Sequence, residues 1–414
     1  MQTFTLAFLT TLTLATATKL WLGVRHLDHV QRHRNSVPAE FANEISLDAH
    51  HRAADYSRAK TRLALVSTVF ECAVILVLTF GGGLQLLQDI TAGWFAPGIA
   101  RGVSLVALLG AIMMAIDIPF DWYRTFGIEQ RFGFNNMTPG LFVIDALKHV
   151  ALAVALIIPL LACILWLMEK SGAWWWIYAW LVLVVFGLFM QLIFPIWIQP
   201  WFNKFTPLAD EQLRQRIEQL VTKCGFKVQG LMIMDGSRRS SHGNAYFIGF
   251  GKTKRIVFFD TLLSRLLPSE IEAVLAHELG HFKLHHVIKR MAWSFLISLL
   301  FLWLLSELMN QSWFYAGLNV QSPSRAMALI LFSIVMPQFI FLLHPLTSYY
   351  SRKHEFEADH YAARHAPVAD LISGLVKLYK DNAATLTPDP LHSAFYDSHP
   401  PATLRIARLQ AAKA

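Results

Sequence analysis

The chain has 414 residues, of which 55% are hydrophobic and only 15% are charged. Soluble domains carry about 25% charged residues, so this composition, with a mean hydropathy of +0.41, excludes an ordinary soluble protein and indicates an integral membrane protein. The formal net charge is +8, but no basic stripe with interleaved aromatic residues accompanies it. We therefore expect no nucleic-acid partner, and we assign the excess Lys and Arg to the membrane flanks.

Seven stretches are apolar over about the 20 residues that a helix needs to cross a bilayer core. They are residues 4–23, 63–86, 102–120, 149–168, 174–196, 291–309 and 326–346. Lys19 and Arg25 follow the first stretch and nothing basic precedes it, which is the reverse of a signal peptide, so we expect a retained span. Charge and polarity inside a span are costly in lipid, and we expect Glu71, Asp117 and Gln191 to face a wet interior.

Basic residues in the connecting loops predict the orientation of the spans. The loop after the first stretch is rich in Lys and Arg, whereas the next loop offers only Arg101. The positive-inside rule then places the N-terminus outside and puts residues 197–290 and 347–414 together in the cytoplasm. The membrane would be the inner membrane of a bacterium or the endoplasmic reticulum of a eukaryote.

Composition divides the chain into four segments. Residues 1–196 hold five spans and residues 291–346 hold two more. Residues 197–290 turn polar and contain strand-like runs such as "GLMIMDG", so we expect a small cytoplasmic domain there. Residues 347–414 resume a charged helical pattern, and we expect a cytoplasmic helical tail there.

The motif with the clearest chemistry is "VLAHELGHFKLHH". His277 and His281 lie one helical turn apart, where both imidazoles can reach one ion, and Glu278 is placed beside them to activate a water. The other interpretation is a surface helix that contains His and Glu by chance. Cysteine cannot supply the metal ligands, because Cys72, Cys163 and Cys224 are isolated and no CxxC pair exists.

The third ligand does not follow on the same helix. His285 continues the stripe of His277 and His281, but it would sit about 12 Å along the axis from His277, too far for bonds of about 2 Å to one ion. The longer HExxHxxGxxH pattern also fails, because Leu284 and Val287 occupy its Gly and His positions.

The tail offers carboxylates in "SRKHEFEADHYAARH". Glu355 and Asp359 share a helix face, with Ala358 and Ala362 permitting close packing. Glu355 would complete a His2Glu site, and Asp359 would orient a ligand. The alternative is a solvated acidic helix. In either case we expect the neighbouring polar residues to lie on the helix surface: His354, Glu357 and His360.

With these residues the chain resembles the CAAX prenyl protease 1 family of membrane zinc metalloproteases. The resemblance extends over nearly the whole chain and includes "DWYRTFGIEQRFGFN", "KFTPL", "SSHGNAYFIGFGKTKRIVFFDTLL", "AHELGHFKLHH", "SRKHEFEADHYA" and "HSAFYDSHPPATLRIARLQ". It implies a mainly α integral membrane protein with seven transmembrane helices enclosing a chamber, capped by a small α+β zinc-protease domain of the gluzincin type. It marks Glu355 as the third ligand and Asp359 as a candidate proton donor.

Two further assignments come from the resemblance. "SHPPATLR" matches the family at His399 and Arg405, a pair suited to an oxyanion. The alternative is that Arg405 only pairs with an acid of the C-terminal helix. "NAYF", with Asn244, Ala245 and Tyr246, resembles an edge strand that holds substrate backbone, although these residues could simply pack under the zinc helix.

The sequence thus predicts a membrane-embedded zinc metalloendopeptidase with one Zn²⁺ per chain, held by His277, His281 and Glu355, with Glu278 as base. Its partners would be the bilayer and a peptide or protein substrate, and the resemblance points to prenylated C-termini. Two other readings are a quality-control protease with no prenyl requirement and a non-enzyme whose zinc only ties the tail to the core. The oligomeric state and the natural substrate do not follow from the sequence.

Overall fold

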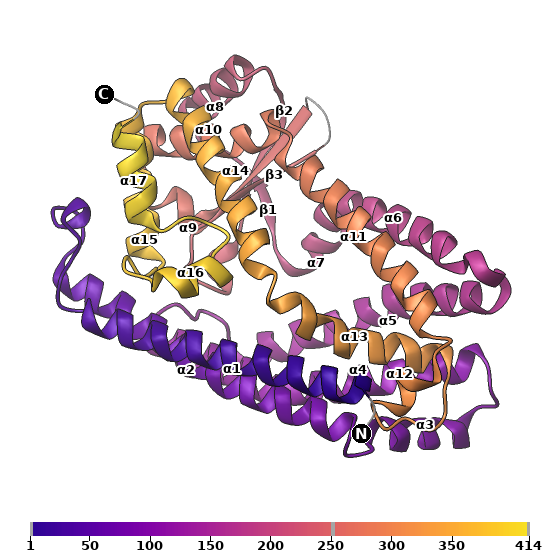
Figure 1. The fold of residues 1–414 in the computed structure, drawn as a ribbon. Coiled ribbons are helices and arrows are strands. Elements are labelled where there is room, and N and C mark those ends of the chain that lie inside the picture. Colours follow the sequence, from indigo (N-terminus) through magenta and orange to yellow (C-terminus); the bar gives the residue numbers. More distant parts are fainter. Residues whose placement is uncertain (1–2, 250–252, 412–414) are drawn as a thin grey trace.

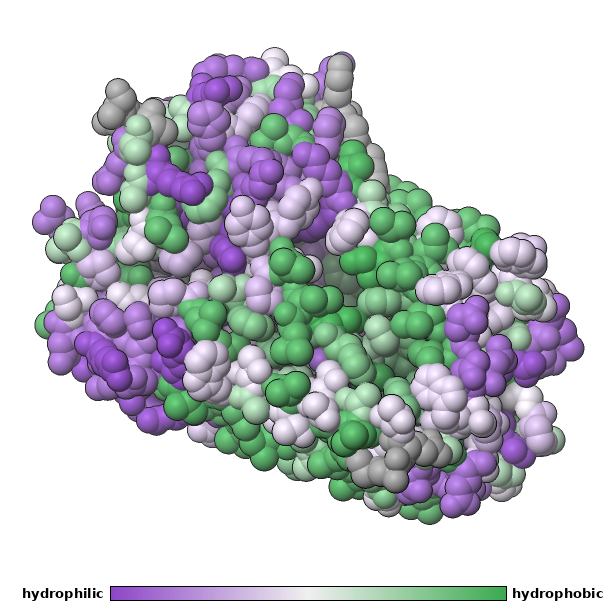
Figure 2. Space-filling model, viewed as in Figure 1, coloured by the Kyte–Doolittle hydropathy of each residue, from purple (hydrophilic) through white to green (hydrophobic). Residues whose placement is uncertain are grey.

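A computed structural model describes residues 3–249 and 253–411 (Figure 1). Long helices form one part of the molecule, and a small sheet with the C-terminal helices forms a polar body beside their ends. Polar residues gather over this body and apolar ones over the long helices (Figure 2). The fold is therefore a mainly α integral membrane protein with a small α+β body, as the sequence predicts.

Six helical segments of the described residues are long and apolar enough to cross a membrane, or seven if one bent pair counts as a span. The six comprise α1 (Thr3–Arg32), α2 (Leu47–Leu78), α4 (Ile99–Trp122) continued to Glu129, α5 (Pro139–Lys170), the segment Gly172–Phe202 containing α6 (Trp175–Ile193), and α11 (His286–Leu308). All seven predicted stretches overlap these helices or the bent pair.

The bent pair is α13 (Arg325–Phe341) and α14 (His344–His365), whose axes differ by 67°. Pro345 lies in the first turn of α14, where its missing N–H removes no helix bond. If α13 continued as one helix through Pro345, it would lose one backbone hydrogen bond, and the proline ring would clash with the carbonyl of the preceding turn. The predicted stretch 326–346 therefore ends as a helix at Phe341, and α14 sets off in a new direction toward the polar body.

The second predicted stretch, 63–86, also differs from the structure. Helix α2 stops at Leu78, and α3 (Gly83–Trp94) starts as a separate helix. Gly82 between them has a φ of 75°, a left-handed conformation that glycine adopts without strain. Glu71, Asp117 and Gln191 are all exposed on their helices, and Glu71 pairs with Lys19 of α1 at 3.5 Å. That they face water rather than lipid stays a prediction.

The sheet has four strands in the order β1-β2-β4-β3. They are β1 (Phe205–Pro207), β2 (Lys227–Met234), β3 (Ala245–Ile248) and β4 (Thr253–Phe259). Strands β2 and β4 are parallel, whereas β1 and β3 pair antiparallel at the two edges. Ile256 and Phe258 of β4 are fully buried in the core beneath α8 (Glu211–Lys223) and α10 (Pro268–Lys283). The sheet thus gives the HExxH helix a fixed support.

Helix α10 packs directly on α14, which brings residues far apart in the sequence together. A Cβ added to Gly280 would lie 3.1 Å from the Cα of Ala358 and 3.1 Å from the Cβ of Tyr361. Ala358 and Ala362 are fully buried at this contact, so the expectation that small residues allow close packing is confirmed. Residues 197–290 and the tail from residue 347 therefore share one polar body.

The close contact at Gly280 leads to a stability prediction. Gly280→Ala should destabilise the protein by about 1–3 kcal/mol, because the neighbouring Ala358 Cα is backbone and cannot move aside. Gly374→Ala is the matched control, since its nearest atom is Val274 Cγ2 at 3.4 Å and alanine improves helix propensity by up to about 1 kcal/mol. Thermal unfolding in detergent measures both. Equal unfolding temperatures for the two variants would contradict the packing argument.

Candidate metal centre

Three side chains converge where α10 meets α14. His277 Nε2 and His281 Nε2 lie 3.2 Å apart on one face of α10. Glu355 of α14 faces them, with Oε2 3.4 Å from His277 Nε2 and Oε1 3.4 Å from His281 Nε2. Suitable ligand atoms of all three residues lie within 4.8 Å of one another. The structure brings together the three residues that the sequence predicts as metal ligands.

The donor set fits a metal ion. Both imidazoles direct Nε2 at the same point, while their Nδ1 atoms contact other side chains. Glu355 Oε2 is buried, and no described residue donates a well-directed hydrogen bond to it, although His399 Nδ1 lies 2.7 Å away. A buried acceptor without a donor is costly. Two imidazole nitrogens and one carboxylate with an open fourth position are typical of a catalytic zinc site.

Asp359 and Arg405 support this group from behind. The Asp359 carboxylate lies 2.8 Å from His277 Nδ1 and accepts two hydrogen bonds from Arg405, from Nε at 2.9 Å and from Nη2 at 2.5 Å. Arg405 comes from α17 (Ala402–Ala411), and both side chains are buried. The bidentate pair fixes the Asp359 carboxylate against the imidazole.

The buried carboxylates set the electrostatics of the site. Burial lowers the pKa of His277, but the adjacent Asp359 and Glu355 carboxylates outweigh it and raise the pKa to about 9. Burial likewise opposes the charge on Arg405, yet the hydrogen bond to Asp359 raises its pKa above the ordinary value. The carboxylates therefore favour positive charge at this point, which a proton or a divalent cation supplies.

Glu278 lies beside the ligands without a structural task of its own. It is half-buried, and within the described ranges its carboxylate makes no hydrogen bond or ion pair.

His399, in contrast, is 63% exposed and reaches back to Glu355 from the loop before α17. Arg405 Nη1 approaches the same carboxylate oxygen at 3.9 Å. Its acidic partner is Asp359 of α14, not an acid of the C-terminal helix.

The predicted edge strand lies next to α10. Strand β3 ends the sheet, and no described strand pairs with its outer side. The Asn244 carbonyl accepts a hydrogen bond from the Phe259 amide at 2.9 Å, and the Tyr246 hydroxyl donates to Gln199 Oε1 at 2.8 Å. Ala245 pairs with Phe258 of β4. The prediction that "NAYF" forms an edge is confirmed, whereas Phe250 to Lys252 of the same motif lie outside the described residues.

Two expectations about neighbouring residues are wrong. His285 does not continue the stripe of His277 and His281, because α10 ends at Lys283 and His285 turns the chain with a φ of 59°. His354 is buried rather than on the surface, and its ring stacks on His286 with centroids 3.9 Å apart. Glu357 is partly exposed, and its Oε2 also lies 2.9 Å from His286 Nε2. His360 is exposed, as expected.

Sequence reasoning missed His286. This residue is buried at the start of α11, and its Nδ1 lies 3.0 Å from His281 Nδ1. The signal available in the sequence was the doubled histidine that ends "FKLHH".

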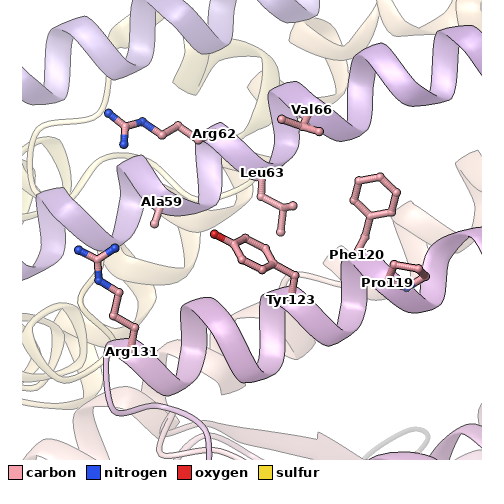
Figure 3. A pocket seen from close by; sticks show the side chains of 8 residues that line it. All are labelled: Ala59, Arg62, Leu63, Val66, Pro119, Phe120, Tyr123 and Arg131. Carbon is pink, nitrogen blue, oxygen red and sulfur yellow. The ribbon is translucent and has the colours of Figure 1, made fainter.

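A cleft between α2 and the end of α4 lies outside this centre. Its volume is about 470 Å³. Figure 3 shows the guanidinium groups of Arg62 and Arg131 at one end and Val66 and Phe120 at the other. None of its lining residues belongs to the metal centre.

Comparison with known proteins agrees with this geometry. Residues 26–204 match the family model "CAAX prenyl protease N-terminal, five membrane helices", and residues 207–413 match "Peptidase family M48". CAAX prenyl protease 1 of Saccharomyces cerevisiae is 33% identical over 399 residues, which cover 90% of this chain and 88% of that protein. The CAAX prenyl protease 1 homolog of Homo sapiens is 32% identical, with 91% of this chain and 89% of that protein covered.

A solved structure agrees as well. The crystal structure of S. mikatae Ste24p superposes with a TM-score of 0.91 at 29% sequence identity, over 99% of both chains. Fold, site and comparisons together define a membrane metalloprotease. The chain belongs to peptidase family M48, with the CAAX prenyl protease 1 proteins as its relatives.

The buried Arg405–Asp359 pair allows a direct test of what holds the tail in place. Arg405→Met should cost about 3–5 kcal/mol of stability, because it leaves the Asp359 carboxylate buried without its partner. Arg408→Met on the same helix is the control: Arg408 is exposed and stacks over Phe356 at 3.8 Å, a contact worth about 0.5–1 kcal/mol. Thermal unfolding in detergent compares them. If Arg405→Met were no worse than Arg408→Met, the pair would not hold the tail.

Proposed function

We propose that the protein is a zinc metalloendopeptidase that cleaves prenylated CAAX-type proteins or peptides near their C-terminus. One Zn²⁺ per chain would be held by His277, His281 and Glu355. The observation that carries this proposal is the convergence of these three donors beside Glu278, whose carboxylate is not engaged elsewhere in the described chain. A zinc that only tied the tail to the core would need no such carboxylate, which argues against a structural role.

Each residue around the ligands has a role that its position supports. When bound, zinc supplies a Lewis acid that polarises the scissile carbonyl and lowers the pKa of the attacking water. Glu278 takes the proton of that water and passes it to the leaving amine. Asp359 holds His277 in the tautomer that leaves Nε2 free, and Arg405 holds Asp359.

His399 is the better placed of the two residues predicted to face the oxyanion. It is exposed and lies beside the ligand Glu355, so it can donate to a developing negative charge on the substrate. Arg405 is buried with two donors committed to Asp359. We therefore propose His399 as the oxyanion donor and Arg405 as a positioning residue, and we assign Asp359 to orientation rather than proton donation.

The free edge of β3 supports extended binding of the substrate backbone. A peptide added to an edge strand gains main-chain hydrogen bonds that do not depend on its sequence. Asn244, Ala245 and Tyr246 would supply this edge, and Phe247 fixes it to α10 through its contact with Phe282, ring centroids 5.6 Å apart. The edge strand can thus hold the scissile bond of different substrates at the same distance from the Glu278 carboxylate.

The prenyl group is proposed from the relatives, which are named CAAX prenyl proteases, and from the surroundings of the site. The surface is hollowed where the polar body meets the apolar helices (Figure 2). An isoprenoid that stays among apolar side chains gains about 0.8 kcal/mol per buried CH₂. The attached lipid could therefore supply much of the affinity while the peptide lies at the metal centre.

The proposed orientation places the metal centre in the cytoplasm and the N-terminus outside. Helix α11 starts beside the site at His286 and runs 23 residues away from it, about 35 Å at 1.5 Å per residue. Thr5 donates to the Gly317 carbonyl at 2.8 Å just beyond its far end. The N-terminal end and the metal centre thus lie at opposite ends of the spans, as the charge rule requires.

The role of Glu278 separates chemistry from metal binding. Glu278→Gln should keep the zinc content and lose nearly all peptidase activity, because the amide cannot take the water's proton. His277→Ala is the comparison variant and should lose both. Metal content by atomic absorption and hydrolysis of a fluorogenic peptide provide the two readings. Zinc loss in Glu278→Gln as large as in His277→Ala would make Glu278 a ligand.

Prenyl recognition is tested with one peptide in two forms. A CAAX peptide farnesylated on its cysteine should be cut between that cysteine and the next residue. Its kcat/KM should exceed that of the S-methylated peptide by at least about tenfold, which the burial of two CH₂ groups already supplies. Equal values would show that the lipid is not read and would favour general turnover of membrane proteins.

Cysteine labelling in intact cells tests the orientation. Single cysteines near residues 45, 135 and 210 and at the C-terminus should all resist a membrane-impermeant reagent, because the positive-inside rule places them in the cytoplasm. A cysteine at position 3 should react and serves as the positive control. Labelling of the C-terminus from outside would contradict the orientation.

A further inference from the structure

A second cluster of histidine and carboxylate lies directly behind the metal centre. His286 and His354 are buried, and Glu357 is partly exposed at the edge of α14. His286 Nδ1 lies 3.0 Å from His281 Nδ1, and His286 Nε2 lies 2.9 Å from Glu357 Oε2. The cluster is thus linked through one ring to His281.

The ring arrangement excludes a second metal ion in this cluster, although three donors are close enough to suggest one. The rings of His286 and His354 are stacked, 3.9 Å apart and inclined by only 10°. Imidazole lone pairs lie in the ring plane, so one ion about 2 Å from both nitrogens would have to lie in both planes. Two nearly parallel planes at this separation share no such point.

The hydrogen bonds instead define a single chain of tautomers. His281 must keep the lone pair of Nε2 for a metal, so the proton of its neutral ring is on Nδ1 and is donated to His286 Nδ1. His286 then carries its own proton on Nε2 and donates it to Glu357. The stacked ring of His354 holds His286 in the plane that both bonds require.

We propose that His286 and Glu357 are positioning residues that hold His281 with Nε2 toward the metal, through the hydrogen-bonded chain Glu357–His286–His281. The other histidine of the motif has the same support with one link fewer, since Asp359 contacts His277 Nδ1 directly. Each metal-facing imidazole is therefore anchored to a carboxylate of α14. This inference rests on the proposed function of the metal centre.

The hydrogen-bonded chain Glu357–His286–His281 requires both an acceptor and a donor at position 286. Two substitutions of His286 therefore test it. His286→Phe fills the space but has neither group. His286→Gln offers an amide oxygen to accept from His281 and an amide nitrogen to donate to Glu357. Glu357→Ala removes the carboxylate that ends the hydrogen-bonded chain, and because Glu357 is partly exposed, it is less critical for folding. His360→Ala, exposed on the same helix, is the control.

The experiment is a zinc-affinity measurement by competition with a chelator on the full-length protein in detergent, with KM and kcat for one peptide. His286→Phe should weaken zinc binding about 10–100-fold, the usual cost of losing an outer partner of a ligand. His286→Gln should recover most of that loss. Glu357→Ala should weaken binding in the same direction, His360→Ala should match the wild type, and KM should stay constant throughout.

Three results would overturn the proposal. Zinc affinity in His286→Phe and Glu357→Ala equal to that of the wild type would show that the chain does not position His281. Equal weakness of His286→Gln and His286→Phe would show that shape rather than hydrogen bonding matters. Two zinc ions per wild-type chain, falling to one in His354→Phe, would make the cluster a metal site. A wild-type protein that binds no zinc would instead refute the proposed function itself.

Discussion

The close contact of α10 and α14 at Gly280 is the constraint on which the metal centre depends. The helices meet where a Cβ at position 280 would lie 3.1 Å from the backbone of Ala358. At this helix spacing the Glu355 carboxylate oxygens lie 3.4 Å from His277 Nε2 and His281 Nε2, which are one turn apart on α10. Helix packing is discrete rather than continuously adjustable, because side chains interlock at near-crystalline density. A wider spacing would leave Glu355 as an unpaired buried carboxylate.

The bend between α13 and α14 serves the same contact. A straight continuation of α13 would carry the chain along the direction of the spans, whereas the 67° turn sends α14 across α10. The tail then closes the far side, with Arg405 bonded to Asp359 in a buried pair. Buried charges are expensive unless they are fully paired. Asp359 therefore links Arg405 of α17 to His277 of α10.

Much of this was predictable from the sequence, because the decisive spacings are local. His277 with His281, and Glu355 with Asp359, each recur one helical turn apart, so any helix presents each pair on one face. The seven apolar stretches are equally visible, since length and hydropathy identify spans. The strand-like run at Ala245–Ile248 is visible in the residues, whereas its position at an edge came from the family resemblance.

The rest depends on geometry that a linear pattern does not contain. The end of α2 at Leu78 was hidden because hydropathy is averaged across the glycines that follow. His354 looks like a surface residue on a helical wheel, and it is buried because α11 starts beside α14 after the left-handed turn at His285. Likewise, Arg405 is drawn to Asp359 by a tertiary contact between α17 and α14. Local secondary-structure propensity does not predict such tertiary contacts.

Anomalous diffraction at the zinc absorption edge, from crystals of the zinc-loaded protein, tests the central claim most directly. We expect one strong peak per chain, about 2 Å from His277 Nε2, His281 Nε2 and a Glu355 oxygen, which are zinc's usual bond lengths to these donors. A peak among His286, His354 and Glu357, or a zinc bound by the two histidines without Glu355, would contradict the account.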